Sequence, residues 1–281
     1  MMHLRFDPVA RVDNISRADF QRGFLEPHRP VVIRDLAASW PALKKWSPHY
    51  FKEQYGQTRV RVYDASFIEP GQTYMSNVQY LSLEHYLDLV LTTSMDLRMF
   101  LYNIMSEIPE LKDDIIFPPI ATGFSRRFIF MFFGCRGSVT PMHYDIDMAH
   151  VFHTPIYGKK RVMLFPHGES KNLYRHPFTT RSYVDVDKPD FHTFPRLKNV
   201  KGSQVLLEPG ETLFIPSGYW HHIVYEEGGY AVSLRSPHQS LAKRMEGVLN
   251  LGVMSPIDRI MNTILSDAWF RWKERKAREA A

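Results

Sequence analysis

The sequence predicts a mainly β fold, a sandwich or a barrel, with mixed helices and strands before it and helices after it. Three observations lead to this prediction. Short apolar segments separated by turns such as EPGE and EEGG fill residues 127–235, helix and strand patterns alternate before them, and a helical pattern returns after residue 240. Short strands at such spacing are typical of sandwiches and barrels, whereas a parallel sheet alternates strands with helices.

No internal repeat and no low-complexity linker interrupts the 281 residues. One compact domain with appendages is therefore favoured. We assign residues 1–240 to this domain, with α/β elements over 1–125 and the β core over 126–240. Residues 241–281 form a C-terminal helical segment, which is a candidate for dimerisation.

The N-terminal elements are expected from local start and stop residues. Serine N-caps open helices, a proline starts a β-branched strand, and a glycine ends a helix. In chain order we expect a helix over Ser16–Glu26, a strand that starts at Pro30, a helix over 47–56 that ends at Gly56, an alternating strand over 59–65 and a helix over Ser82–Leu91.

Four apolar stretches make up the expected β core, and one apolar stripe marks the C-terminal helix. The stretches are RFIFMFFG, KRVMLFP, SQVLLEPGETLFIPSGYWHHIVY and YAVSLR. The stripe has a period near 3.6 and comprises Ile257, Ile260, Met261, Ile264, Leu265, Ala268 and Trp272. We expect it to pack on the barrel or on the same helix of a second subunit.

The composition narrows the class of protein and the cellular compartment in which it is expected. Cys135 is the one cysteine, so the chain has no intramolecular disulfide and no cysteine-based zinc site, and a cytoplasmic location is expected. No apolar leader and no window of membrane-spanning length appears, so secretion and membrane insertion are not expected. The net charge of +5 is mild, and the basic run RWKERKAREA suits a solvated helix end better than a nucleic-acid contact.

The segment TPMHYDIDMAHVFH gathers three histidines and two aspartates. If MHYDID is a strand, His143 and Asp145 share one face while Tyr144 points away. A third ligand is expected from PSGYWHHIVY, in which adjacent residues face opposite ways, so His221 or His222 would bind but not both. Two histidines and one carboxylate form a facial triad that suits non-haem Fe(II) and oxygen chemistry.

The segment GKKRVMLFP offers a cation for a keto-acid cosubstrate. One lysine of the pair Lys159 and Lys160 would point inward at the start of the strand and would need a counter-charge. The alternative, which the residues alone favour, is a pair of surface lysines beside a turn at Gly158.

Three segments, SVTPMHYDID, YGKKRVMLFP and EPGETLFIPSGYWHHIVYEEGG, resemble in order and spacing the JmjC/cupin-like 2-oxoglutarate oxygenases. The closest type is the asparaginyl hydroxylase called factor inhibiting hypoxia-inducible factor. Segments before the barrel, such as RPVVIRDLAASWPALKKWSPHYFKEQYG and PELKDDIIFPP, extend the likeness to roughly residues 10–237. The resemblance implies a double-stranded β-helix, or jelly-roll, with Fe(II), 2-oxoglutarate and O2 as cofactor and cosubstrates.

The resemblance also implies individual roles. It selects His221 over His222 because the family's ligand follows a tryptophan, here Trp220, and it selects Lys160 over Lys159. The implied site consists of the iron ligands His143, Asp145 and His221, of Lys160 and Thr140 on the distal carboxylate of 2-oxoglutarate, and of Tyr102 as an aromatic hydroxyl that completes the pocket. Thr140 is off the face parity of His143, and a bend at Pro141 would correct this.

The sequence departs from the family pattern near these ligands. Between Asp145 and Lys160 it is two residues longer, and Arg235 lies near a position where the asparaginyl hydroxylase has an asparagine. Asp147 is expected at the pocket rim or on the plain surface. His150 and His153 could form a second metal pair or line the pocket, although hydrogen-bonded core or edge histidines are the favoured interpretation.

The resulting expectation is an Fe(II)/2-oxoglutarate dioxygenase that hydroxylates a protein or peptide side chain. The alternatives are an RNA-modifying hydroxylase of the same fold, which the basic C-terminal run alone favours, and a non-catalytic metal-binding or ligand-binding cupin module. A homodimer is expected through the C-terminal helices, on the basis of Trp269, Trp272 and the dimers of the family.

Overall fold

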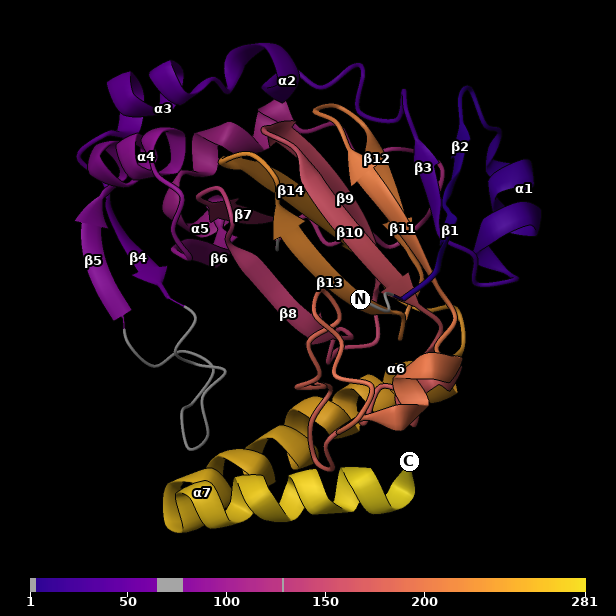
Figure 1. Ribbon diagram of the computed structural model, residues 1–281. Coiled ribbons are helices and arrows are strands. Elements are labelled where there is room, and N and C mark those ends of the chain that lie inside the picture. The colour runs from indigo at the N-terminus through magenta and orange to yellow at the C-terminus, as the bar shows by residue number, and fades with distance from the viewer. Residues whose placement is uncertain (1–3, 65–77, 128) are drawn as a thin grey trace.

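Two β-sheets form the centre of the molecule in the computed structural model, which describes residues 4–64, 78–127 and 129–281 (Figure 1). The first sheet has the order β1 (Phe6–Pro8), β11 (Gly202–Leu207), β10 (Lys160–Phe165), β13 (Trp220–Tyr225) and β8 (Val139–His143). The second has the order β2 (Ala10–Val12), β3 (Val31–Ile33), β12 (Thr212–Ile215), β9 (His150–Tyr157), β14 (Gly229–Ser236), β7 (Phe130–Gly134), β6 (Arg98–Asn103), β4 (Arg59–Tyr63) and β5 (Val78–Ser82).

The two sheets form a jelly-roll-like sandwich, which confirms the predicted mainly β fold. Apolar side chains from both sheets meet in its interior, among them Val162 and Ile223 from the first sheet and Val151 and Leu213 from the second. Nearly all strand pairs are antiparallel, as expected for a jelly-roll. All four predicted apolar stretches contain strands of this core.

The chain crosses between the sheets at Gly158, after β9 and before β10. Gly158 has φ 72°, and a Cβ there would lie 2.5 Å from the Gly228 carbonyl oxygen. Glycine is therefore required, because other residues are strained at positive φ and would also clash here. The turn makes Lys160 the first residue of β10.

N-terminal helices cover the outer face of the nine-stranded sheet (Figure 1). They are α1 (Arg17–Phe20) with a π-helical continuation (Gln21–Leu25), α2 (Ala42–Lys45), α3 (Pro48–Tyr55), α4 (Leu83–Thr92) and α5 (Ile104–Glu107). Ser16, Ser47 and Ser82 cap α1, α3 and α4 through their side chains, and α3 ends before Gly56, as predicted. Residue 65, the last of the strand expected over 59–65, lies outside the described residues.

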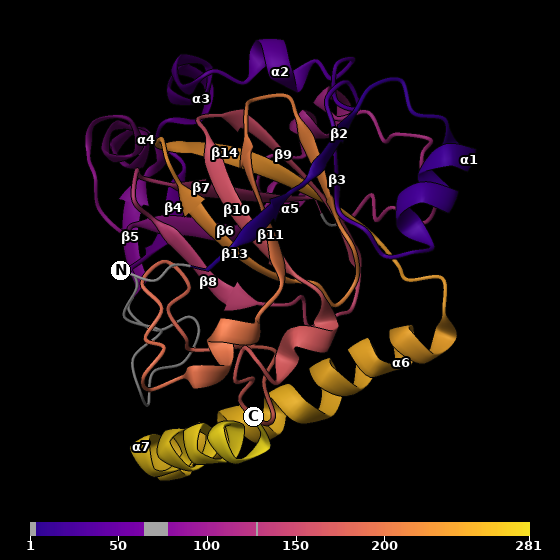
Figure 2. The same ribbon diagram turned by 45° about the vertical axis from the view of Figure 1, so that its right-hand side comes forward.

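The C-terminal helices cross beneath the sandwich (Figure 2). α6 (Leu241–Leu249) leads through a π-helical segment (Asn250–Met254) into α7 (Ser255–Ala280). α7 is interrupted at Ser266 (φ 41°, ψ −117°), where Figure 1 shows the chain turning back. In a straight helix Asp258 and Lys273 would be more than 20 Å apart, yet the two side chains form an ion pair of 2.6 Å.

The predicted continuous stripe on this helix is therefore wrong. Ile260 and Ile264, before the break, are 55% and 69% exposed, whereas Trp269, after it, is buried and stacks on Trp272 at 4.6 Å. None of the described helices combines the length and the apolar character that a membrane span requires.

Candidate metal and cosubstrate site

His143, Asp145 and His221 converge at the open end of β8 and β13. One ligand atom from each lies within 4.8 Å of the other two. His143 is paired with His221 across the two strands, and their ring centroids are 4.2 Å apart. The strand ends at His143, so Asp145 follows it in a turn, and the expectation of one continuous strand over MHYDID is wrong. Tyr144 points away, as predicted, and packs edge-on against Trp220.

Backbone carbonyl groups fix the orientation of both imidazoles. Nδ1 of His143 lies 2.8 Å from the Pro141 oxygen, and Nδ1 of His221 lies 3.1 Å from the Tyr219 oxygen. A carbonyl oxygen only accepts, so each Nδ1 carries the proton and each Nε2 presents a lone pair. Burial, with the nearby His221, lowers the pKa of His143 to about 3, and burial also lowers the pKa of His221. Both rings are therefore neutral ligands near neutral pH.

The third ligand, Asp145, is held by Arg235. Nη2 of Arg235 donates to Oδ1 of Asp145 at 2.8 Å and to Oδ1 of Asp147 at 2.9 Å. Burial alone would raise the pKa of Asp145, but the charges of Arg235, His221 and His143 outweigh it and hold the pKa at about 2. Asp145 is thus a carboxylate, and the set of two imidazoles and one carboxylate fits a divalent metal of the Fe(II) type.

His222 lies on the opposite face of β13 from His221. Its Nε2 donates to the Asp187 carboxylate at 2.9 Å, outside the barrel. The structure therefore brings His221, and not His222, to the pair formed by His143 and Asp145.

Lys160 lies inside the barrel on the same face of the first sheet as His221. It pairs with Tyr225 across β10 and β13, and its Nζ lies 4.0 Å from the Tyr225 ring centroid. It is 1% exposed, burial lowers the pKa of its ammonium group, and no described carboxylate contacts it. Lys159 instead lies at the surface, 3.3 Å from Glu208. A buried ammonium group without a counter-charge is costly and suits an anionic ligand.

Thr140 faces the interior because the pairing of β8 shifts by one residue. His143 pairs with His221 and Thr140 pairs with Ile223, so two residues of β8, Pro141 and Met142, oppose one residue of β13, His222. This bulge at Pro141 is the bend that was expected to bring Thr140 to the same face as His143.

Tyr102 does not join this group. It pairs with Met131 in β7 and packs against Phe133 in the core beneath the N-terminal helices. Phe132 lies between Met131 and Phe133 in β7 and points to the opposite face, where it contacts His153. The Tyr102 hydroxyl is buried and has no hydrogen-bond partner among the described residues.

His153, for which the sequence favoured a hydrogen-bonded core or edge histidine over a pocket residue, lies in the interior of the barrel. Its Nδ1 lies 2.8 Å from the Ser233 hydroxyl, while its buried Nε2 has no partner among the described residues. Burial lowers its pKa, and the charges of Lys160 and His221 act in the same direction. His153 therefore lines the space beside Lys160 and is ready to bond a ligand there.

His150 belongs to a second histidine group, with His28 and His238. Ligand atoms of these three also lie within 4.8 Å of one another. However, Nδ1 of His150 accepts from the Ser217 amide at 3.0 Å, and Nδ1 of His238 accepts from the Ser240 amide at 2.8 Å. The proton of each neutral ring is then on Nε2, so these rings form hydrogen bonds and do not present a metal ligand.

Comparison with known proteins places these residues in context. A family model described as a cupin-like domain matches residues 17–240. Lysine-specific demethylase 8 of Xenopus tropicalis is 29% identical over 232 residues, 78% of this chain and 50% of the relative. Jumonji C domain-containing protein 5 of Drosophila melanogaster is 25% identical over 255 residues, 80% of this chain and 59% of the relative. The chain thus spans little more than half the length of these two relatives.

A third relative is matched over most of its length. The tRNA wybutosine-synthesizing protein 5 of Gallus gallus is 24% identical over 259 residues, 84% of this chain and 80% of the relative. None of these three is the asparaginyl hydroxylase with which the motifs were compared. The JmjC/cupin-like resemblance is supported, and the likeness to that one hydroxylase stays an expectation.

Proposed function

The chain belongs to the family of cupin-like domains, and from this premise we propose that it is an Fe(II)- and 2-oxoglutarate-dependent oxygenase. The observation that carries the proposal is the convergence of His143, Asp145 and His221, with ligand atoms within 4.8 Å of one another. The buried Lys160 on the same interior face, which no described carboxylate contacts, adds the site for an anionic cosubstrate.

Each residue has a defined task in this proposal. His143, Asp145 and His221 would hold Fe(II), and Lys160 and Thr140 would hold the distal carboxylate of 2-oxoglutarate. When bound, Fe(II), 2-oxoglutarate and O2 supply the chemistry that converts a C–H bond to C–OH and releases succinate and carbon dioxide. The protein fixes the ligands and keeps the interior dry, which the apolar residues Val162 and Ile223 support. We assign Tyr102 no contact with the cosubstrate.

For the primary substrate, we propose a protein or peptide side chain. The name of the Xenopus relative specifies a lysine side chain, and this chain matches half of that relative's length. The substrate is a proposal for this chain, and so are the hydroxylated atom and any likeness to asparaginyl hydroxylation.

An RNA substrate is the second candidate, because the chain covers 80% of a tRNA wybutosine-synthesizing protein. The basic run at the end of α7 gives this candidate less support than the sequence suggested. Lys273 pairs with Asp258, Lys276 with Glu279 and Arg278 with Glu274. A transfer RNA titration of wild type against a variant in which Arg271 and Arg275 are glutamine tests it.

A non-catalytic cupin module is the remaining alternative. A metal-binding module would also account for the orientation of both imidazoles, but it leaves the buried Lys160 on the same interior face without a function. We therefore favour the enzyme.

We further propose a homodimer through α6 and the first half of α7, a division of the chain after residue 240, and a cytoplasmic location. Exposed apolar side chains support the dimer surface: Leu241, Met245, Val248, Leu249, Ile260 and Ile264. Trp269 is not part of it, because it packs within the chain. The location rests on the single, buried Cys135.

The test of the enzyme is succinate formation from 2-oxoglutarate and Fe(II) under air, without a primary substrate. Slow turnover is expected in wild type and in Lys159→Ala, the matched surface control, and it should be lost in His143→Ala and Lys160→Ala. Failure of the Fe(II)-loaded protein to bind 2-oxoglutarate under nitrogen would contradict the proposal and favour the non-catalytic module.

A further inference from the structure

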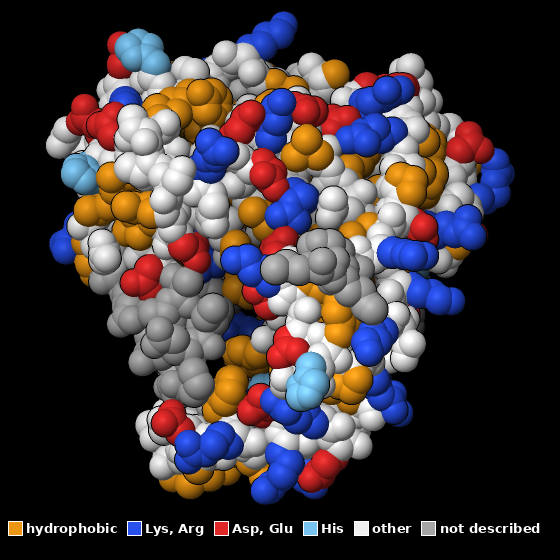
Figure 3. Space-filling view, viewed as in Figure 1, with side chains coloured by type: hydrophobic (Ala, Val, Ile, Leu, Met, Phe, Trp, Pro, Cys, Tyr) orange, Lys and Arg blue, Asp and Glu red, His pale blue; other side chains and the backbone are white. Residues whose placement is uncertain are grey.

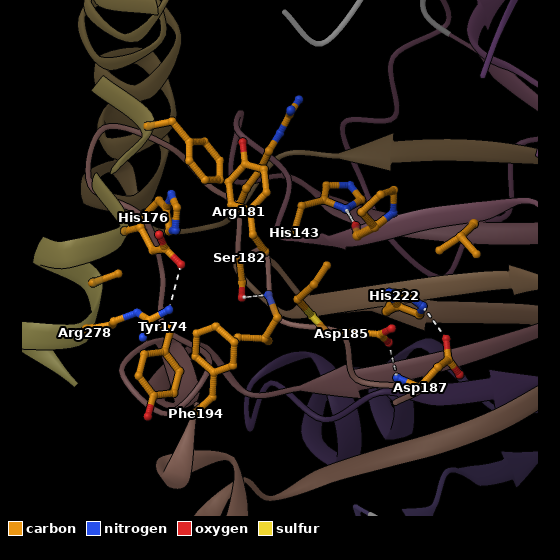
Figure 4. Close-up of a pocket in the computed structure, with 18 of the residues that line it drawn as sticks. His143, Tyr174, His176, Arg181, Ser182, Asp185, Asp187, Phe194, His222 and Arg278 are labelled. Carbon is orange, nitrogen blue, oxygen red and sulfur yellow. Dashed lines mark hydrogen bonds and ion pairs between the residues drawn. The ribbon is translucent and has the colours of Figure 1, made fainter. Parts of the chain in front are cut away.

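Tyr225 lies at the end of β13 farthest from the metal ligands, and its side chain points into the barrel interior. Alternate residues of a strand share one face, so His221, Ile223 and Tyr225 line the same interior face. Figure 4 shows His222, between the first two, directed outward to Asp187. His221 and Tyr225 are four residues apart, which corresponds to about 13 Å along the strand. The interior space between them begins at the metal ligands and ends at the Tyr225 ring.

The molecular surface is hollowed at the metal end of this space. Figure 3 shows a hollow above the C-terminal helices, where a cavity of about 470 Å³ lies outside β8 and has His143 in its wall. Lys160 and Tyr225 are not among the described residues that line this cavity, and they are 1% and 2% exposed. A ligand held by Lys160 would therefore be enclosed, and the far end of the interior would limit its length.

The Tyr225 ring closes the far end because it spans the distance between the two sheets. A Cβ at Gly134, in β7 of the nine-stranded sheet, would lie 2.9 Å from the Cε1 and Cζ atoms of the ring. This is closer than packed carbon atoms approach, so the glycine leaves room for the ring and for nothing more. The Tyr225 amide also donates to the Ser138 carbonyl oxygen at 3.0 Å, and its carbonyl oxygen accepts from the Gly137 amide at 2.8 Å. The turn between β7 and β8 thus fixes this end of β13 and the ring with it.

The ammonium group of Lys160 lies over the face of this ring. Lys160 pairs with Tyr225 across β10 and β13, and its Nζ lies 4.0 Å from the ring centroid. The face of an aromatic ring is electron-rich and attracts a cation. The ring therefore holds the ammonium group on one side, and a carboxylate can bond it from the other side, toward His221. The buried apolar side chains of Val162 and Ile223 form walls of the space between.

We propose that Tyr225 sets the length of the cosubstrate, because its ring fixes the ammonium group of Lys160 at one distance from the metal ligands. Tyr225 is a positioning residue, since it acts through Lys160 and not on the reacting atoms. A 2-oxo dicarboxylate with one methylene group more than 2-oxoglutarate would press its distal carboxylate toward the ring, which has no space to move at Gly134. The apolar walls would not accept this carboxylate elsewhere. This inference rests on the proposed function and specifies which 2-oxo acids the site accepts.

The test measures the binding of two acids and needs no turnover. The full chain with Co(II) in place of Fe(II) is titrated by calorimetry with 2-oxoglutarate and with 2-oxoadipate, which has one more methylene group. Wild type should bind 2-oxoglutarate at least about tenfold more tightly. Tyr225→Leu removes the ring and should lower this ratio of affinities to about threefold or less. Tyr225→Phe keeps the ring and should retain the wild-type ratio.

Two further variants complete the design. Tyr80→Leu, at a tyrosine that is 48% exposed, is the matched control and should behave as wild type. Tyr225→Met replaces the leucine variant if thermal unfolding shows that the latter does not fold. A methionine side chain fills a similar space but is flexible, so the same fall in the ratio is expected.

Equal affinity of wild type for the two acids would overturn the inference. A ratio that Tyr225→Leu and Tyr225→Met leave unchanged, or that Tyr225→Phe already loses, would do so as well. If Lys160→Met abolishes the binding of 2-oxoglutarate but the ratio does not depend on Tyr225, the oxygenase proposal stands and only the length limit fails. If neither acid binds to wild type, the oxygenase proposal fails and this inference fails with it, so the two failures are distinguishable.

Discussion

Arg235 and Asp145 form a 2.8 Å ion pair in which the guanidinium group bonds one oxygen of the expected iron ligand. Because the same Nη2 also bonds Asp147, the turn after β8 is tied to β14 at two points. The second oxygen of Asp145 would then hold the proposed metal. Arg235 would thus position Asp145 as a metal ligand, and Asp147 bonds the same guanidinium nitrogen.

Replacement of Arg235 should weaken metal binding. Loss of a residue that orients a metal ligand typically costs about 10- to 100-fold in affinity, and we expect Arg235→Gln to fall in this range for Co(II), measured by absorption as a substitute for Fe(II). Without Arg235 the pKa of Asp145 should rise, because the largest of the charges that lower it is lost. Metal binding should therefore fail at a higher pH than in wild type as acid is added. Arg11→Gln, at an exposed ion pair with Glu211, is the control, and equal Co(II) affinity in both variants would contradict the role.

Lys160→Met should abolish 2-oxoglutarate binding without destabilising the fold. The buried ammonium group has no described counter-charge, so its removal relieves a desolvation cost, and the contact that it gives up is the one with the Tyr225 ring. In thermal unfolding, 2-oxoglutarate should stabilise wild type and the Lys159→Met control but not Lys160→Met. If Lys160→Met unfolds at a lower temperature than wild type and is still stabilised by 2-oxoglutarate, Lys160 does not hold this ligand.

The same lysine should give the ligand-free protein a characteristic pH dependence. Burial lowers its folded-state pKa, so between that value and the ordinary pKa of lysine only the unfolded chain holds the proton. Stability of the wild type should therefore rise with pH in this window, and the rise should be smaller in Lys160→Met. Urea unfolding at several alkaline pH values measures the difference.

Much of the candidate site could be predicted from the sequence because it depends on strand periodicity. Adjacent residues of a strand face opposite sides, so only one of His221 and His222 could meet His143, and the family pattern selected His221, which lies beside His143 in the structure. The parity argument for Thr140 even required the bulge at Pro141 that the structure contains. His143 and Asp145 were expected on one face of a continuous strand. The two side chains do lie close together, although the strand ends at His143.

The failures occurred where a local irregularity changes the face or the direction of an element. The pairing of β6 with β7 shifts between Met99 and Tyr102, and the resulting face of Tyr102 is not encoded in any residue pattern. The break at Ser266 has no proline or glycine to announce it, and the chain reversal is stabilised by tertiary bonds from Asp258 to Trp269 and Lys273. Such contacts join residues whose proximity only the folded chain reveals.

The exposed apolar surface of α6 and α7 predicts which substitutions dissociate the proposed dimer. Ile264→Asp places a charge on this surface at a residue that is 69% exposed, so a monomer is expected in sedimentation with the fold intact. Trp269→Ala should instead destabilise the chain itself by about 3 kcal/mol, because Trp269 is buried against Trp272 and bonded to Asp258. Wild-type protein that sediments as a monomer at micromolar concentration would rule out the surface as a dimer contact.

Replacement of Gly247 in α6 by alanine should lower the stability of the protein, although helix propensity alone predicts that it raises it. Glycine to alanine inside an exposed helix usually stabilises by up to about 1 kcal/mol. A Cβ at Gly247, however, would lie 2.3 Å from the Asp147 carbonyl oxygen, in the turn that carries the anchor of Arg235. Gly247→Ala should therefore lower the melting temperature and weaken Co(II) binding together, because α6 or the turn must move.

Gly252, in the π-helical segment that follows α6, is the matched control. A Cβ there would meet nothing within 4 Å, so Gly252→Ala should leave Co(II) binding unchanged and leave the melting temperature equal or higher. If the two variants behave alike in both measurements, the contact between α6 and the turn does not support the metal site. If only Gly247→Ala loses affinity for Co(II), the contact between α6 and the turn at Asp147 supports the proposed metal ligand Asp145.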